Sequence, residues 1–122
     1  MVRVLTVDDQ ALFRQIARDL VDHTPGFEVV GESSDGAAAI RLAREIDPDM
    51  VILDVRMAGL DGIDTARRLH DEDPTRVVVL ASSADVHDLA ALSEACGAAA
   101  LVRKHWLTPR LLRGLWVVHR RR

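Results

Sequence analysis

Short apolar runs alternate along the chain with segments whose apolar residues recur at the helical spacing of three or four. The most apolar run, Met50–Asp54, is typical of a strand buried on both faces of a parallel sheet. Leu12, Ile16 and Leu20 instead lie four apart, on one face of a predicted helix. Regular alternation of strands and helices predicts an α/β fold, a parallel sheet with helices on both sides. We expect strands at 3–8, 27–31, 50–54, 76–81 and 99–102, and helices at 11–21, 36–46, 61–70, from 85 or 88 to 96, and from 109 onward.

Residues with known preferences for helix ends mark several of these boundaries. Asp35 can cap the helix that begins at residue 36, and Asp47-Pro48 ends it. Gly97 stands where a glycine usually follows a helix, and Thr108-Pro109 opens the last helix with a cap and a proline.

Length and composition predict one domain without disulfides. The chain has 122 residues, 48% of them hydrophobic and 29% charged, which excludes a disordered polypeptide. Cys96 is the single cysteine, so it forms no internal disulfide and no thiolate zinc site. We expect one domain over residues 1–119 and a basic end at 120–122.

The charge and the apolar runs indicate the compartment and exclude two classes of partner. The net charge is −3, and the three terminal arginines mask a larger acidic excess in residues 1–119. An acidic surface binds nucleic acid poorly, because phosphate neutralisation drives such binding. No apolar run approaches the ~18 residues of a membrane span. The chain also opens directly on a strand-like run, so we expect a cytoplasmic domain with neither nucleic acid nor membrane as a partner.

Polar residues follow the predicted strands at the points where the strands end. The carboxyl ends of parallel strands meet at one edge of the sheet, where ligands bind. Three carboxylates in one crevice repel each other, since two charges ~4 Å apart cost about 4 kcal/mol at an effective dielectric constant of 20. A divalent cation with oxygen ligands, such as Mg²⁺, relieves this repulsion. The residues concerned are Asp8, Asp9, Asp54, Ser82 and Lys104.

Asp54 is the carboxylate at the end of the most apolar strand and is therefore the most firmly held. A carboxylate can attack phosphorus and form an acyl phosphate. Phosphoryl transfer needs positioning and neutralised phosphoryl oxygens, which Mg²⁺, Lys104 and the Ser82 hydroxyl can supply. The residues alone therefore predict a Mg²⁺-assisted phosphate acceptor.

The chain resembles the receiver domain of two-component response regulators over essentially its whole length. The resemblance implies a doubly wound, flavodoxin-like sheet of strand order 2-1-3-4-5. Lys104 is followed by His105 and not by a proline. In this respect the chain resembles receivers of the LuxR/NarL type, which usually precede a helix-turn-helix domain. Such a domain after Arg122 would link the chain to transcription. The motifs that carry the resemblance are Val7-Asp8-Asp9, Val51-Ile52-Leu53-Asp54-Val55-Arg56-Met57, Gly59-Leu60-Asp61-Gly62, Ser82 and Leu101-Val102-Arg103-Lys104.

The resemblance also implies a role for each residue of the cluster. Asp54 accepts phosphate from a sensor histidine kinase, and Ser82 and Lys104 bind the phosphoryl group. Mg²⁺ lies between Asp9, Asp54 and the backbone carbonyl of Arg56, with Asp8 bound through water. The reaction is self-phosphorylation from a phosphodonor followed by autodephosphorylation, so the domain acts as a switch rather than a metabolic enzyme.

Two departures from the family pattern support an alternative function. Leu101 stands where the family has an aromatic switch residue, and Ala58 replaces the usual proline. A phosphate-independent receiver that acts as an interaction module fits these departures. A phosphatase with an aspartyl intermediate does not fit, because it needs a second acid two residues after the nucleophile, where Arg56 stands.

The predicted last helix has an apolar arc wider than one face against the sheet requires. Leu111, Leu115 and Val118 form one stripe, and Leu112 and Trp116 lie on an adjacent one. One interpretation is that Trp116 packs on the body of the domain. The other is that Trp116 and Leu112 contact a second copy of the chain or an effector protein.

Overall fold

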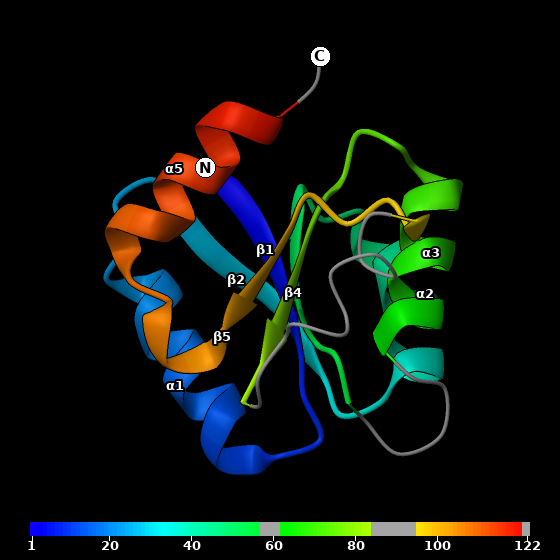
Figure 1. Cartoon of the computed structure of the whole chain (residues 1–122), viewed down its shortest axis with the longest axis horizontal. Coiled ribbons are helices and arrows are strands. Elements are labelled where there is room, and N and C mark those ends of the chain that lie inside the picture. Colours follow the sequence, from blue (N-terminus) through cyan, green and yellow to red (C-terminus); the bar gives the residue numbers. More distant parts are fainter. Residues whose placement is uncertain (57–61, 84–94, 121–122) are drawn as a thin grey trace.

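The computed structural model describes residues 1–56, 62–83 and 95–120. Five parallel strands form one sheet in the order β2-β1-β3-β4-β5, which confirms the predicted order (Figure 1). The strands are β1 (Val2–Val7), β2 (Phe27–Ser33), β3 (Met50–Asp54), β4 (Val77–Ser82) and β5 (Ala100–Arg103).

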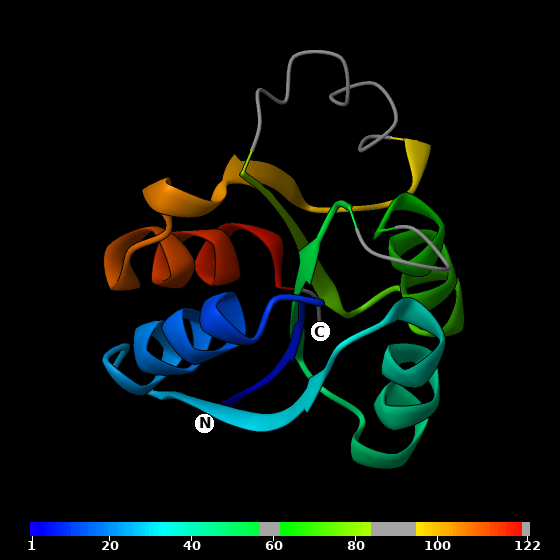
Figure 2. The ribbon, with the colours of Figure 1, turned by 90° about the horizontal axis from the view of Figure 1, so that it is seen from below.

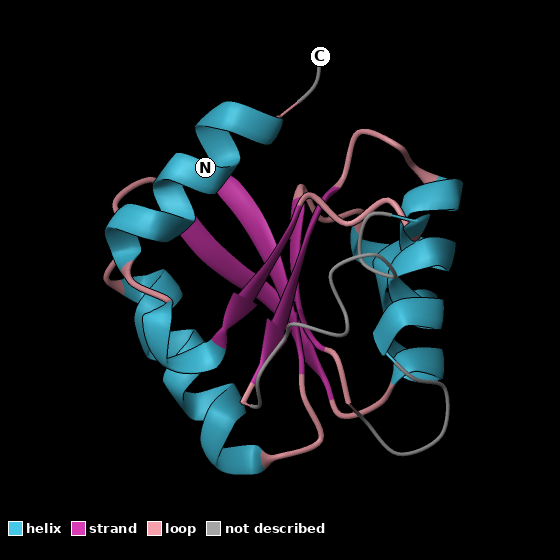
Figure 3. Cartoon of the chain, viewed as in Figure 1, coloured by secondary structure: helices cyan, strands magenta, loops and turns pink. Residues whose placement is uncertain are grey.

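Helices cover both faces of this sheet, as the alternation of elements predicts. Helices α1 and α5 lie on one face, and α2 and α3 on the other (Figures 2 and 3). The predicted helix between β4 and β5 falls mainly on residues 84–94, outside the described residues. The described helices are α1 (Ala11–Asp22), α2 (Gly36–Ile46), α3 (Gly62–Glu72) and α5 (Pro109–His119), with a short 3-10 turn, η2 (Lys104–Trp106).

The central strand β3 and its neighbour β4 are buried along their whole length, as their composition predicts. Successive side chains of a strand point to opposite faces. In β3, Val51 and Leu53 therefore join the core under α2 and α3, whereas Met50 and Ile52 join the core under α1 and α5.

The predicted helix boundaries are largely confirmed. The Asp35 carboxylate accepts a hydrogen bond from the Ala38 N–H at 2.8 Å and caps α2. The Thr108 hydroxyl accepts from the Leu111 N–H at 3.1 Å at the start of α5. Asp47 (φ 48°) and Gly97 (φ 84°) adopt the left-handed conformation that ends helices.

The face of α1 that the spacing of Leu12, Ile16 and Leu20 indicated is not the buried face. Leu12 is 74% exposed and Ile16 49%, whereas Ala17 and Val21 are buried. The sheet-facing residues are also four apart and begin with the half-buried Phe13. The small Ala17 side chain lets the helix approach the sheet closely, which a spacing argument based on large apolar residues misses.

In α5 the structure places the two candidate interface residues against the body of the domain. Leu112 is fully buried, so the prediction that it offers a contact surface is wrong. Trp116 is half-buried and packs on the same core cluster. The exposed apolar side chains of this helix are Val117 (56%) and Val118 (74%). Within the described ranges, none of the helices is both long and apolar enough to cross a bilayer.

Candidate functional site

Three carboxylates converge at the carboxyl edge of the sheet. Val7 of β1 pairs with Leu53 of β3, so the residues that follow lie at the same level. Asp8, Asp9 and Asp54 each place one carboxylate oxygen within 4.8 Å of the other two. Asp8 and Asp54 are buried and Asp9 is exposed. The cluster therefore has two buried members and one at its solvent side.

Backbone hydrogen bonds hold Asp8 in place. Its carboxylate accepts from the Gln10 N–H at 2.9 Å, and its own N–H donates to the Ser33 carbonyl at 3.1 Å. The Arg14 guanidinium donates to the Asp8 carbonyl at 2.7 Å. Gln10, not an aspartate, is the N-cap residue of α1, and its side chain makes no capping bond. Asp8 therefore fixes the turn before α1 rather than capping it.

Hydrogen bonds of the backbone that follows β3 hold Asp54 in place. The Arg56 N–H donates to the Asp54 carboxylate at 3.3 Å. Val55, which directly follows Asp54, donates its N–H to the Ala81 carbonyl of β4 at 3.0 Å. The Val55 carbonyl accepts a hydrogen bond from the Gly62 N–H at 3.0 Å. The start of α3 thus lies directly against the backbone that carries the carboxylate.

Lys104 brings a positive charge into the cluster. Its ammonium lies 2.6 Å from an Asp8 oxygen and 3.6 Å from an Asp54 oxygen. The side chains of Lys104, Asp8 and Asp54 are 7%, 4% and 8% exposed, so little water screens these charges. One buried ammonium therefore faces two buried carboxylates, and the group carries a net negative charge.

This imbalance affects the protonation of Asp54. Burial raises the pKa of the Asp54 carboxyl above its usual range, and the neighbouring Asp8 carboxylate adds to the increase. The Lys104 ammonium and the Arg56 N–H oppose it by favouring the ionised form. A further cation at the cluster would lower the pKa of Asp54 and favour the carboxylate.

The donor set fits a hard divalent cation. Among the described residues, Asp8, Asp9 and Asp54 offer carboxylate oxygens, the ligand type that Mg²⁺ prefers, and these oxygens lie close enough together to share one ion. Lys104 leaves one of the two buried negative charges unbalanced, and Asp9 faces solvent, from which an ion would enter. Asp8, Asp9 and Asp54 would supply its carboxylate ligands.

The sheet register brings one further predicted residue, Ser82, toward the cluster. Asp54 pairs with Ala81, so the buried Ser82 follows one position further along β4. Ser82 in turn pairs with Arg103, the residue before Lys104.

Leu101 is half-buried and packs on the core under α2 and α3. Ala58 and the rest of 57–61 lie outside the described residues.

Sequence reasoning missed two residues of α1 that contact the cluster. Arg14 binds the Asp8 carbonyl, and the Phe13 ring lies 4.1 Å, measured to its centroid, from the Lys104 ammonium. The available signal was the spacing of Phe13, Ala17 and Val21, which marks the buried side of the helix.

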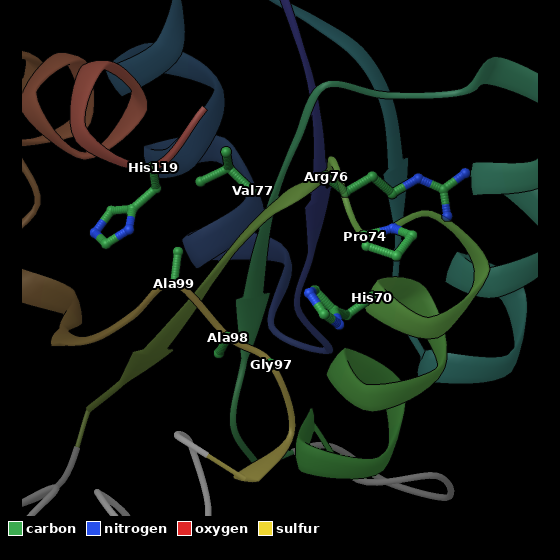
Figure 4. A pocket seen from close by; sticks show the side chains of 8 residues that line it. All are labelled: His70, Pro74, Arg76, Val77, Gly97, Ala98, Ala99 and His119. Carbon is green, nitrogen blue, oxygen red and sulfur yellow. The ribbon is translucent and has the colours of Figure 1, made fainter. Parts of the chain in front are cut away.

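A pocket of about 330 Å³ lies at the opposite edge of the sheet, where β4 and β5 begin (Figure 4). The Arg76 guanidinium points away from it and donates to carbonyls of Leu69 and Ala43 at 3.3 Å. Val77 begins β4 and Asp54 ends β3, so this pocket is separate from the acidic cluster. Its lining consists of His70, Pro74, Arg76, Val77, Gly97, Ala98, Ala99 and His119.

Comparisons with known proteins show the family to which this fold belongs. The family model of the response regulator receiver domain matches residues 4–115. The nitrate/nitrite response regulator protein NarP of Escherichia coli is 39% identical over 94 residues, 76% of this chain and 44% of that protein. A protein-glutamate methylesterase/protein-glutamine glutaminase of Thermotoga maritima is 38% identical over 82 residues, 67% of this chain and 24% of that protein. The chain thus spans less than half the length of either relative.

A solved structure extends the similarity to the whole fold. The signal receiver domain of the putative response regulator NarL from Mycobacterium tuberculosis superposes with a TM-score of 0.83 and 31% identity. The match covers 93% of this chain and 95% of that one. The strand order, the acidic cluster with its lysine and the family match over residues 4–115 lead to one conclusion: the chain belongs to the response regulator receiver domains of two-component systems.

Proposed function

We propose that the chain is a phosphoacceptor switch whose Asp54 receives a phosphoryl group from the phosphohistidine of a sensor histidine kinase. One observation carries the proposal: the buried Lys104 ammonium lies between Asp8 and Asp54, with Asp9 beside them at the solvent side. The cluster gathers a nucleophile, a cation that neutralises phosphoryl oxygens and ligands for a metal. A cytoplasmic location is part of the proposal, because sensor kinases transfer phosphate there.

In the proposed reaction an Asp54 carboxylate oxygen attacks phosphorus. A phosphorus–oxygen bond forms as the phosphorus–nitrogen bond to the donor histidine breaks, and the electron pair of that bond returns to the imidazole. Mg²⁺ held by Asp9, Asp54 and the Arg56 carbonyl would neutralise charge on the phosphoryl oxygens. Lys104 pairs with one phosphoryl oxygen and the Ser82 hydroxyl donates to another.

Incubation with acetyl phosphate and Mg²⁺ tests this proposal. Intact-mass measurement should show the mass of one added phosphoryl group on the wild type. Asp54→Ala should show none, because it lacks the nucleophile, and chelation of Mg²⁺ should suppress the product on the wild type. A wild type that stays unmodified by acetyl phosphate and by its kinase would favour the phosphate-independent interaction module, which the non-aromatic Leu101 keeps as the second candidate.

A partner contact at α5 is a further part of the proposal. The exposed side chains of Val117 and Val118, next to the half-buried Trp116, form the apolar outward part of this helix. We propose a second copy of the chain as the partner, with an effector protein as the other candidate.

Sedimentation before and after phosphorylation measures this self-association. Val118→Asp should weaken any phosphorylation-dependent dimer, because it places a charge in the contact. Trp116→Ala should have a smaller effect on the dimer, since much of that side chain packs on the core. If neither variant changes sedimentation or partner binding in either phosphorylation state, α5 carries no such surface.

A further inference from the structure

The ammonium of Lys104 has an aromatic neighbour. The nitrogen lies 4.1 Å from the centroid of the Phe13 ring, within the range in which a cation is attracted to the face of an aromatic ring. Its other neighbours are Asp8 at 2.6 Å and Asp54 at 3.6 Å. The ammonium is therefore held by carboxylates and by a ring face, and its side chain is 7% exposed.

The first turn of α1 contacts both members of the Lys104–Asp8 ion pair. Phe13 lies against Lys104, and the next residue, Arg14, donates from its guanidinium to the Asp8 carbonyl at 2.7 Å. A displacement of Lys104 relative to Asp8 thus changes a contact of this turn directly. The same helix presents Leu12 and Ile16 to solvent.

The other aromatic residues, and Leu101 at the position of the family's aromatic switch, have different surroundings from Phe13. The chain has two phenylalanines, two tryptophans and no tyrosine. The Trp106 ring lies 5.2 Å from the Arg103 guanidinium, and Phe27 is buried at the start of β2. Leu101 packs under α2 and α3, on the face of the sheet opposite α1.

We propose that Phe13 is a positioning residue that acts through Lys104. The ring holds the ammonium inside the cluster, 3.6 Å from an Asp54 oxygen, in the unphosphorylated chain. When the phosphoryl group on Asp54 draws Lys104 toward itself, the contact with the ring changes and the first turn of α1 responds. This inference rests on the proposed phosphorylation of Asp54, and it provides a path from that event to the exposed surface of α1.

Fluorine NMR on protein labelled with para-fluorophenylalanine tests the contact. The chain has two phenylalanines, so Phe27 serves as an internal reference for Phe13. Lys104→Met should move the Phe13 signal and leave the Phe27 signal in place, because methionine removes the cation from the ring. An unmoved Phe13 signal in the folded variant would overturn the proposal without any phosphorylation experiment.

The same labelled protein tests the response to phosphorylation. Once intact mass confirms the phosphoryl adduct, the Phe13 signal should shift and the Phe27 signal should not. A stationary Phe13 signal in fully phosphorylated protein overturns this inference and leaves the proposed function intact. Absence of the adduct with both acetyl phosphate and the kinase overturns the proposed function itself, and with it the path to α1.

Kinetics separate positioning from a merely structural role. Phe13→Leu keeps an apolar side chain and removes the ring, so phosphorylation by acetyl phosphate should slow by about three- to tenfold. Phe13→Tyr retains the ring face and should restore the rate, and Ile16→Ala, on the exposed side of α1, should not change it. Equal rates for the leucine, tyrosine and wild-type proteins of equal thermal stability would overturn the role of the ring.

Discussion

Lys104→Met should lower the free energy of unfolding by about 3 kcal/mol at neutral pH, because removing one partner of a buried ion pair leaves an uncompensated charge. Asp8 and Asp54 have oxygens within 4.8 Å of each other, and the substitution removes the ammonium that contacts both of them. Urea unfolding without divalent cations measures the loss. Phosphorylation by acetyl phosphate should also slow by about a hundredfold, since a phosphoryl oxygen loses its fixed cation.

The pH dependence of this loss follows from the pKa of Asp54. That pKa is already raised by burial, and removal of Lys104 raises it further. An acid with a raised pKa in the folded state destabilises the fold when it is ionised, above that pKa, and ceases to do so as the pH falls below it. The deficit of Lys104→Met should therefore shrink as the pH is lowered.

A second substitution provides the control. Asp8→Asn in the Lys104→Met background removes one of the repelling carboxylates and should recover part of the lost stability. A Lys104→Met protein as stable as the wild type at neutral pH would show that these three charges are not coupled as described.

Gly62→Ala should destabilise the domain by roughly 3 kcal/mol and disturb the proposed phosphorylation site. A Cβ at this position would lie 2.3 Å from the Asp54 carbonyl oxygen and 2.6 Å from Val55 backbone atoms. Backbone atoms cannot move aside as a flexible side chain can, so α3 or the end of β3 must shift. Denaturant unfolding measures the first effect, and the rate of phosphorylation by acetyl phosphate measures the second.

Gly114→Ala is the matched control on α5. Its Cβ would meet no atom within 4 Å, and alanine favours a helix over glycine by about 0.5–1 kcal/mol. This variant should be slightly more stable than the wild type and be phosphorylated at the same rate. Equal stability of the two alanine variants would contradict the close approach of α3 to the end of β3.

The alternation of apolar runs predicts a parallel sheet between helix layers, because strands buried on both faces, such as β3 and β4, are apolar at nearly every residue. The strand order is predicted from the family resemblance, and together they give the topology. The convergence of Asp8, Asp54 and Lys104 follows from that topology, since parallel strands share an edge. Strand ends differ by one or two residues from prediction, as in β5, where hydrogen bonding to β4 sets residues 100–103 rather than 99–102.

Other details of the site depend on contacts that spacing does not encode. Apolar residues four apart occur on two sides of α1, and only packing on the sheet selects Ala17 and Val21 over Leu12 and Ile16. The sequence likewise places Lys104 near the carboxylates without indicating that Asp8, rather than Asp54, is its closer partner. The Phe13 contact depends on both of these outcomes.

Chemical mapping of the phosphorylated residue tests the account at its centre. Borohydride reduces an acyl phosphate to an alcohol, so it converts a phosphorylated aspartate into homoserine. After reaction with acetyl phosphate and Mg²⁺, reduction, proteolysis and peptide sequencing should find homoserine at position 54 and aspartate at positions 8 and 9. Homoserine at position 8 or 9, or a phosphorylated chain with no homoserine at 54, would contradict the assignment of Asp54 as the nucleophile held by this cluster.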